Sequence, residues 1–307
     1  MRHAQAHQRG GAAARLGEIV QSSVIGGWLL VVEQMAEKFK IGLALGSGGV
    51  RGMAHFGVIR TLIKHGIKIS CVAGSSSGSV IGAALAAGKL DVFEDFFRRI
   101  NWWKMFRMFF EFSLPWRGGY LTGKRIKEEL RKRLGRIRFE DCPIPFTAVA
   151  MDMMNGKEYP ITSGDLVDGT FASMAVQGLF KPVAHEGHWL GDGGLDNPLP
   201  IDACRRMGAD YVIAVDVNLG QPLQAEYSPD KVPSLWTIFT QTCRIIENNW
   251  TDRILRTNPP DVLLQPDLHD IFMARLRHVT RAILRGKIAA ERWIESLAPE
   301  TRMRMMA

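Results

Sequence analysis

The sequence predicts an α/β fold with a mainly parallel sheet and helices on both faces. Residues 41–45 (IGLAL) form a short apolar run typical of a buried parallel strand. A glycine-rich turn follows, and the next segment carries apolar residues at helical spacing and stops at Gly66. A second strand at residues 67–76 and a second helix at residues 78–90 repeat this order. Strands and helices that alternate with short connections predict parallel pairing.

Length and composition restrict the class of protein. The chain has 307 residues, of which 46% are hydrophobic and 23% charged, which excludes collagen-like, low-complexity and wholly disordered chains. Its apolar runs fall short of the roughly 18 residues that a transmembrane helix needs. The four cysteines are scattered and show no metal-binding spacing, which favours a reducing compartment.

Three further strands and a C-terminal helix are predicted downstream. Strands are expected at residues 146–153, 157–162 and 209–217, and residues 269–297 carry an apolar face at helical spacing. No internal repeat or interdomain linker interrupts residues 41–300, so we expect a single domain there.

Residues 1–40 differ from the rest and are expected to be a separate extension. The first part is polar and rich in alanine and glycine, which predicts disorder. Val24–Val32 is apolar enough to touch a membrane, but Glu33–Lys38 offers no signal-peptidase site. Met35 opens a segment typical of the start of a compact domain, so a mis-assigned start that adds residues 1–34 is an alternative interpretation.

Gly74–Gly78 fits the pattern G-x-S-x-G between the second strand and the second helix. In that position a sharp turn holds the central serine in a strained backbone conformation at the carboxyl edge of the sheet. Glycines are needed on both sides because a Cβ atom would clash with the neighbouring strand and helix. The pattern predicts that Ser76 is a nucleophile, and a purely structural turn is the alternative.

The first glycine-rich turn, Gly46–Gly52, supplies what a nucleophilic serine needs. Attack on an ester develops negative charge on the carbonyl oxygen, which backbone N–H groups at a helix N-terminus stabilise. We expect Gly48 and Gly49 to donate these hydrogen bonds and Arg51 to add positive charge. A nucleotide-binding loop is the alternative, but no acidic residue ends the second strand and no Gly-Lys-Ser/Thr follows.

Asp192 stands between glycines, and prolines follow it. Taken alone, this is an ordinary Asp-Gly turn. Together, Ser47–Gly52, Gly74–Gly78 and Asp192–Gly194 resemble, in order and approximate spacing, the three signature blocks of the patatin-like phospholipase family. The resemblance extends over residues 41–200 and is strongest to the small bacterial members.

This resemblance implies a three-layer α/β/α fold and a serine–aspartate dyad that works without histidine. Ser76 corresponds to the nucleophile and Asp192 to the base, with the first glycine loop as the oxyanion hole. The chain departs from the family pattern at Ser47, where glycine is more usual, and at Gln177-Gly178, where a proline is usual. Neither departure touches the dyad, and the second is expected to reshape the acyl pocket.

An aspartate becomes a useful base for a serine only when it is buried. An exposed carboxyl has a pKa near ~3.9, and desolvation raises it. The residues alone leave two alternatives to Asp192 as the only partner of the serine. Asp196 lies close by on the same loop, and a Ser-Asp-His triad would recruit His269 or His278.

A basic and aromatic stretch is the remaining feature. Between Arg98 and Arg138 the chain has thirteen basic and three acidic residues, a surplus larger than the +8 of the whole chain. Trp102, Trp103 and Phe106 interleave with the first of these cations. The pattern favours contact with an anionic membrane surface, and a helix with an aromatic core face and a solvated basic face is the alternative. No nucleic-acid motif accompanies the charge, so no nucleic-acid partner is expected.

The sequence thus predicts a serine acyl hydrolase that cleaves phospholipids or other lipid esters through an acyl-enzyme. We expect no metal and no cofactor, and a cytoplasmic protein that binds transiently to the inner face of the membrane. A membrane-binding or regulatory protein with little turnover is the alternative from a different class, and a Ser-Asp-His esterase is the other. Headgroup, acyl-chain and positional preference, and the oligomeric state, do not follow from the sequence.

Overall fold

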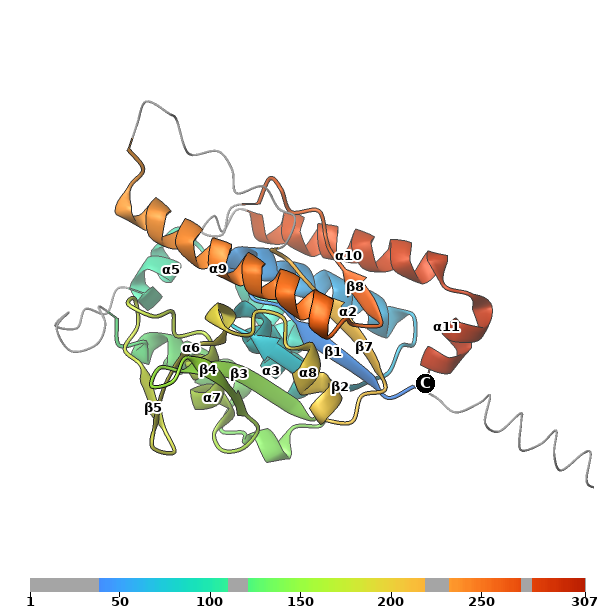
Figure 1. Cartoon of the computed structure of the whole chain (residues 1–307), viewed down its shortest axis with the longest axis horizontal. Helices are drawn as coiled ribbons and strands as arrows, with labels where there is room; N and C mark the ends of the chain where they lie inside the picture. Colours follow the sequence, from blue (N-terminus) through green and yellow to red (C-terminus); the bar gives the residue numbers. More distant parts are fainter. Residues whose placement is uncertain (1–38, 110–120, 219–231, 272–277, 307) are drawn as a thin grey trace, which may run out of the picture. The chain divides into compact units, whose positions relative to one another are not determined.

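A single twisted sheet carries the residues that the sequence singles out (Figure 1). The computed structural model describes residues 39–109, 121–218, 232–271 and 278–306. Most of the expected N-terminal extension and part of the basic stretch therefore lie outside the described residues. The predictions made for the extension stay predictions.

Within the described residues the sheet has eight strands, and its hydrogen-bonded path runs β5-β6-β3-β2-β1-β7-β8, with β4 paired to β3. The strands are β1 (Ile41–Leu45), β2 (Ile69–Ser75), β3 (Phe146–Asp152), β4 (Lys157–Ile161), β5 (Val183–His185), β6 (His188–Asp192), β7 (Tyr211–Val215) and β8 (Val262–Leu264). All pairs from β3 to β8 are parallel, whereas the pairs β3–β4, β3–β6 and β5–β6 are antiparallel. The predicted mainly parallel sheet is confirmed.

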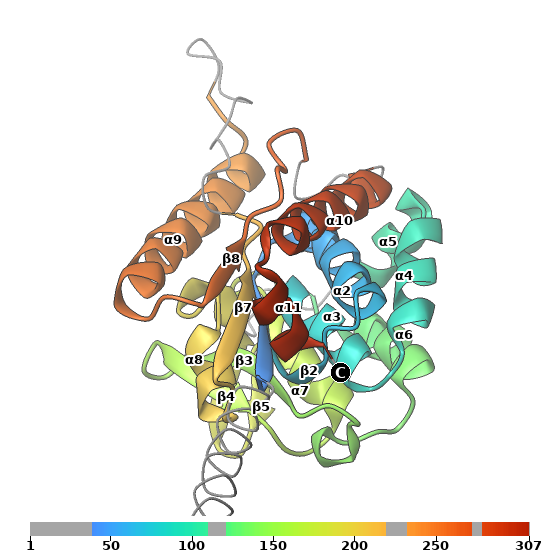
Figure 2. The same cartoon turned by 90° about the vertical axis from the view of Figure 1, so that its right-hand side faces the viewer.

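Helices cover both faces of this sheet, which gives three layers (Figure 2). On one face lie α2 (Ala54–Lys64), α3 (Ser77–Ala86), α7 (Leu166–Ser173) and α10 (Val279–Ser296); on the other lie α8 (Ile201–Arg206) and α9 (Leu235–Thr257). All five residues of β1 are buried, because this strand is covered on both faces. The core between α8 and the sheet comprises Ala44, Cys71, Ala73, Val149, Leu199, Ile201, Ala203, Cys204, Ala209, Val212 and Ala214.

The remaining helices surround this sandwich. They are α4 (Leu90–Arg99), α5 (Trp102–Phe109), α6 (Lys124–Leu134) and α11 (Pro299–Met305). Helix α2 ends as predicted, because Gly66 has a φ of 74° and its N–H donates to the carbonyl of Ile63 at 3.0 Å.

Of the helix expected at residues 269–297, residues 279–296 form α10 and residues 269–271 are not helical, while residues 272–277 lie outside the described residues. Before α10, Ile271 N–H donates to the carbonyl of Leu268 at 3.0 Å, and His269 Nδ1 lies 2.6 Å from Asp267 Oδ1. These local turn contacts compete with helix formation, so the amphipathic pattern of the sequence overestimates the helix at its N-terminal end.

Helices α2 and α10 touch through their backbones. A Cβ atom on Gly57 would lie 1.9 Å from the carbonyl oxygen of Ile283, and one on Gly286 would lie 1.9 Å from that of Ala54. Glycine inside a helix lowers its stability by about 1 kcal/mol relative to alanine. Here the close approach that glycine permits offsets that loss.

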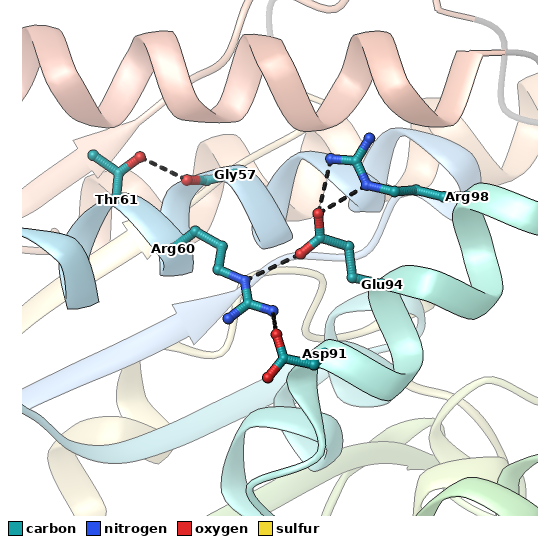
Figure 3. A network of polar contacts seen from close by, with 6 residues as sticks. All are labelled: Gly57, Arg60, Thr61, Asp91, Glu94 and Arg98. Atoms are coloured by element: carbon teal, nitrogen blue, oxygen red, sulfur yellow. Dashed lines mark hydrogen bonds and ion pairs between the residues drawn. The ribbon is translucent and has the colours of Figure 1, made fainter.

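A polar network joins α2 to α4 beside this contact (Figure 3). Arg60 Nε donates to Glu94 Oε2 at 3.1 Å, and a second nitrogen of Arg60 pairs with Asp91. Arg98 Nε donates to the other oxygen of Glu94 at 2.9 Å. These ion pairs are partly exposed, so each contributes at most about 1 kcal/mol, and the apolar contacts beneath them supply most of the stability.

We expect Gly286→Ala to lower the free energy of unfolding by about 2 kcal/mol or more, because the new methyl group meets backbone that cannot move aside. Chemical denaturation measures the change. Leu284→Ala is the matched control, since Leu284 lies on the same helix and is 51% exposed, and we expect it to change stability by at most about 0.5 kcal/mol. A Gly286→Ala protein as stable as the control would contradict the close contact.

Candidate active site

Ser76 and Asp192 meet because two strands end at the same point along one edge of β3. Strand β2 pairs with β3 as far as Ser75, which lies opposite Val149. Strand β6 pairs with the next residues of β3, and Asp192 lies opposite Ala150. Strand β4 fills the other edge of β3 along the same residues, so β2 and β6 share one edge and run toward each other.

The turn after β2 has the strained backbone that the sequence predicts. Ser76 has φ 53° and ψ −119°, a conformation that residues other than glycine rarely adopt. A Cβ atom on Gly78 would lie 2.1 Å from the carbonyl oxygen of Leu45, and one on Gly74 would lie 2.4 Å from that of Gly78. Both glycines of the pattern are therefore needed for close approach of the backbone.

Asp192 is the hydrogen-bond acceptor for the serine. Ser76 Oγ–H donates to Asp192 Oδ2 at 2.7 Å, and the N–H of Gly194 donates to Oδ1 at 2.8 Å. The carboxyl is 5% exposed. Burial raises the pKa of Asp192 to about 6, against the opposing effect of the hydrogen bonds from Ser76 and Gly194.

The glycine loop beside this pair is held at several backbone atoms. The N–H of Gly46 donates to the carbonyl of Val215 at 3.0 Å, and that of Ser47 donates to the carbonyl of Pro198 at 2.9 Å. His55 Nε2 lies 2.8 Å from the carbonyl oxygen of Gly46, to which it donates. Burial lowers the pKa of His55 to about 4, so the ring is neutral at neutral pH.

The loop leads into the short 3₁₀ helix η1 (Gly49–Met53), beside the start of α3. A Cβ atom on Gly52 would lie 2.3 Å from Ser77 Oγ, so the helix touches the residue that follows the serine. The N–H groups of Gly48 and Gly49 come before the first hydrogen bond inside η1, which leaves them able to donate to another acceptor. Their assignment to an oxyanion hole stays a prediction.

The side chain of Arg51 points into the protein interior. It is 3% exposed, and its Nε donates to the carbonyl of Ile271 at 2.8 Å. Burial and the nearby cation Arg244 together lower the pKa of Arg51 to about 10, against the opposing effect of Glu247. The guanidinium of Arg51 is thus bonded to the segment that precedes α10. Its contribution to the oxyanion hole stays a prediction.

A buried carboxyl that the sequence analysis missed lies behind the glycine loop. Ser47 Oγ–H donates to Glu247 Oε1 at 2.7 Å, and Asn218 Nδ2 donates to Glu247 Oε2 at 2.9 Å. Burial, opposed by the hydrogen bond from Ser47 and aided by the charge of Asp192, raises the pKa of Glu247 to about 8. The one signal in the sequence is Ser47 itself, since a hydroxyl stands where the family more often has glycine.

The alternative partners of the serine lie elsewhere. His269 is exposed and bonded to Asp267, and His278 is buried at the position directly before α10. Among the described residues, the hydrogen bond from the Ser76 hydroxyl leads to Asp192 and none leads to a histidine or to Asp196.

Gln177, the second departure from the family pattern, supports the same strand. Its Nε2 donates to the backbone oxygen of Asp192 at 2.8 Å, and a Cβ atom on Gly191 would lie 2.8 Å from that nitrogen. The expected effect of Gln177 on an acyl pocket stays a prediction.

In the described part of the chain, no group of three or more His, Cys, Asp or Glu side chains is arranged to hold a metal ion. Within the same residues, no helix combines the length and apolarity that crossing a bilayer requires.

Comparison with known proteins identifies the family. A model described as patatin-like phospholipase matches residues 43–205, which include Ser76, Asp192 and the glycine loop. The chain belongs to the patatin-like phospholipase family. Its mostly parallel sheet between two helical layers is the fold that the resemblance implied.

Several relatives of this patatin-like protein have names of their own. An uncharacterized NTE family protein of Mycobacterium bovis is 36% identical over 197 residues, which cover 64% of this chain and 54% of that protein. Lysophospholipase nte1 of Aspergillus fumigatus is 31% identical over 224 residues, which cover 72% of this chain and 14% of that protein. The structure of VipD from Legionella pneumophila aligns with a TM-score of 0.44 and 13% identity, over 85% of this chain and 67% of that chain. The chain thus spans about half the length of the mycobacterial relative and a small part of the fungal one.

We expect Asp192→Asn to stabilise the patatin-like domain, and more so at high pH. Because the pKa of Asp192 rises from 3.8 to about 6 on folding, the folded protein loses stability as the pH rises through this range, by about 3 kcal/mol in total. The asparagine stays neutral and can accept from Gly194 while donating to Ser76. Urea denaturation should show the full gain at pH 8 and roughly half of it at pH 5. Asp252→Asn, on the exposed side of α9, is the control, and an equal gain at both pH values would contradict the burial effect.

Proposed function

We propose that the protein is a lipid acyl hydrolase in which Ser76 and Asp192 act as a catalytic dyad. Membership of the patatin-like phospholipase family, and relatives named lysophospholipase, support lipid hydrolase activity. The observation that carries the finer proposal is the 2.7 Å hydrogen bond from the Ser76 hydroxyl to a buried carboxylate. A base whose pKa is about 6 is ionised at neutral pH and still basic enough to take part in proton transfer.

In the first half of the reaction, Ser76 Oγ attacks the ester carbonyl carbon while its proton passes to Asp192 Oδ2. The tetrahedral intermediate carries its negative charge on the former carbonyl oxygen, where the N–H groups of Gly48 and Gly49 donate. Collapse of the intermediate breaks the bond to the alcohol, which leaves with the proton from Asp192. The acyl group then remains on Ser76.

In the second half, water takes the place of the alcohol. Asp192 accepts a proton from the water as its oxygen attacks the acyl carbonyl, and the intermediate collapses to release the fatty acid. The proton returns to Ser76 Oγ, which restores the dyad. The strained turn keeps Ser76 at the edge of the sheet throughout, so the same two side chains serve both steps.

We also propose that α5 contacts an anionic membrane surface. Trp103 is 71% exposed and packs edge-on against Phe106, with ring centroids 6.4 Å apart. An exposed tryptophan beside basic side chains suits the depth of the lipid headgroups.

The charge of this region is lower than the sequence count indicates. Carboxylates from outside the basic stretch pair with several of its cations: Arg98 with Glu94, Arg99 with Asp95, Lys127 with Asp168, and Arg131 with Asp165. Lys104 and Arg133 lie over the ring of Phe96 and close to Glu129. The proposed membrane contact therefore depends on the exposed aromatic ring as much as on charge.

Labelling with a fluorescent fluorophosphonate tests the nucleophile. We expect the Ser76 oxygen to bond to phosphorus as fluoride leaves, so that Ser76→Ala abolishes labelling and lowers hydrolysis of short p-nitrophenyl esters by at least about 10³-fold. Asp192→Asn should lower hydrolysis by a similar factor, because the asparagine accepts no proton. Ser163→Ala, which removes an exposed hydroxyl, is the control. A folded protein that labels equally well without Ser76 would refute the assignment.

Sedimentation with vesicles that contain anionic phospholipid tests the membrane contact. We expect Trp103→Ser to weaken binding by about fivefold or more, because the ring no longer enters the interface. Leu284→Ser, at an exposed position on α10, should leave binding unchanged. Equal binding of Trp103→Ser and the unmodified protein would exclude α5 as the contact.

A further inference from the structure

Ser47 is fixed through both its side chain and its backbone. Its hydroxyl donates to Glu247 Oε1 at 2.7 Å, and its carbonyl oxygen accepts from Asn218 Nδ2 at 2.9 Å. The same Asn218 nitrogen donates to Glu247 Oε2 at 2.9 Å, so the three residues form a closed ring of hydrogen bonds. All three side chains are buried, and Glu247 and Asn218 come from far along the chain.

These bonds set the direction of one peptide group. In a trans peptide the C=O and the following N–H point in opposite directions. Asn218 holds the oxygen of Ser47 on its own side, so the N–H of Gly48 points away from Asn218. A Cβ atom on Gly48 would lie 2.3 Å from Val217 Cγ2 and 3.3 Å from Asn218 Oδ1. The residues that follow β7 therefore pack closely against the glycine loop.

The ring also lies against the carboxylate of the dyad. Around the position of a Cβ atom on Gly194, Glu247 Oε1 lies at 2.6 Å, Ser47 Oγ at 2.7 Å and Asp192 Oδ1 at 3.1 Å. The network thus reaches from the glycine loop to the residue that accepts the serine proton, with only a glycine between them.

We propose that Glu247 and Asn218 are positioning residues that orient the Ser47–Gly48 peptide, so that the Gly48 N–H faces the oxyanion formed over Ser76. This inference rests on the proposed hydrolase function. It explains why this chain has serine at position 47, where the family more often has glycine, because a glycine has no hydroxyl to bond to Glu247. A hydroxyl donates to a carboxylate and accepts from a carboxylic acid, so the contact survives in either protonation state of Glu247.

Four charged groups interact with Glu247. Arg244 lies on the same helix, Arg51 comes from η1, Asp192 from the end of β6, and Asp216 from the end of β7. Asp216 Oδ1 accepts from the backbone N–H of Asn218 at 2.9 Å, which fixes the second member of the ring. The positioning residues are therefore themselves held in place.

Steady-state hydrolysis of p-nitrophenyl butyrate tests the proposal with Asn218→Ala, Glu247→Ala and the conservative Glu247→Gln. We expect the two alanine variants to lower kcat about 30-fold with KM changed by at most about twofold, because a misdirected N–H weakens the transition state alone. Glu247→Gln should keep kcat within about threefold, since its oxygen can accept from Asn218 while its nitrogen donates to Ser47. Asp252→Asn, at a half-exposed position on α9, is the control.

The affinity for a long-chain trifluoromethyl ketone distinguishes a positioning role from a merely structural one. The ketone adds to a serine as a hemiketal whose oxyanion occupies the hole, so its affinity should fall in the alanine variants by the same factor as kcat. Thermal melting checks that each variant is folded. If a larger substitution unfolds the protein, Ser47→Ala, which changes the volume least, tests the proposal instead. We expect Ser47→Ala to lower kcat and the affinity for the ketone about tenfold.

The outcomes separate the two proposals. Loss of kcat and of ketone affinity together, in folded variants, supports the positioning role. Unchanged kcat in folded Asn218→Ala and Glu247→Ala, or a fall in kcat with ketone affinity retained, overturns it. Absence of Ser76-dependent hydrolysis in the unmodified protein overturns the hydrolase function and this inference with it, a result that Ser76→Ala measured in parallel identifies.

Discussion

The meeting of β2 and β6 along one edge of β3 is the constraint on which the site depends. A parallel strand and an antiparallel strand end at adjacent residues of the same neighbour, Val149 and Ala150. Strand β6 ends at Asp192, and Ser76 directly follows the last residue of β2, so the hydrogen-bond register of the sheet sets the distance between Ser76 and Asp192. The backbone of Gly193 packs against the oxygen of Val149, 2.1 Å from where a Cβ atom would lie. A shift of one residue in this register would separate the pair.

Exclusion of water has two effects at this point of the sheet. It raises the pKa of Asp192 to about 6, and it raises that of Glu247 to about 8. Oxygens of both carboxyls lie close to the Cβ position of Gly194, and the charge of Asp192 further disfavours ionisation of Glu247. Asp192 is thereby suited to receive a proton, whereas Glu247 is largely neutral at neutral pH and suited to hold a loop. Similar burial thus gives two carboxyls different chemical properties.

The sequence predicts the turn around Ser76 better than it predicts the residues that the fold brings to that turn. The turn around Ser76 needs only a strand, two glycines and a helix, and all of these are consecutive, so its geometry follows from the pattern. Asp192 is predicted as a partner only through the family resemblance, because strand β6 is short and its pairing depends on the free edge that β2 leaves on β3. Glu247 is bonded to a residue two hundred positions away, so no window of the sequence contains both. The partner of His269 also depends on the fold: its ring pairs with Asp267 in the turn before α10.

The packing of α10 on α2 has a consequence for where this domain can be divided. Helix α2 continues directly from η1, and Arg51 in η1 bonds to Ile271 just before α10. The segment that matches the family ends at residue 205 and contains both members of the proposed dyad. A fragment cut there would keep the reactive pair and lose Asn218, Glu247 and the helix against which the glycine loop is braced. The smallest unit able to carry the proposed chemistry therefore extends beyond the segment that matches the family and includes Asn218, Glu247 and α10.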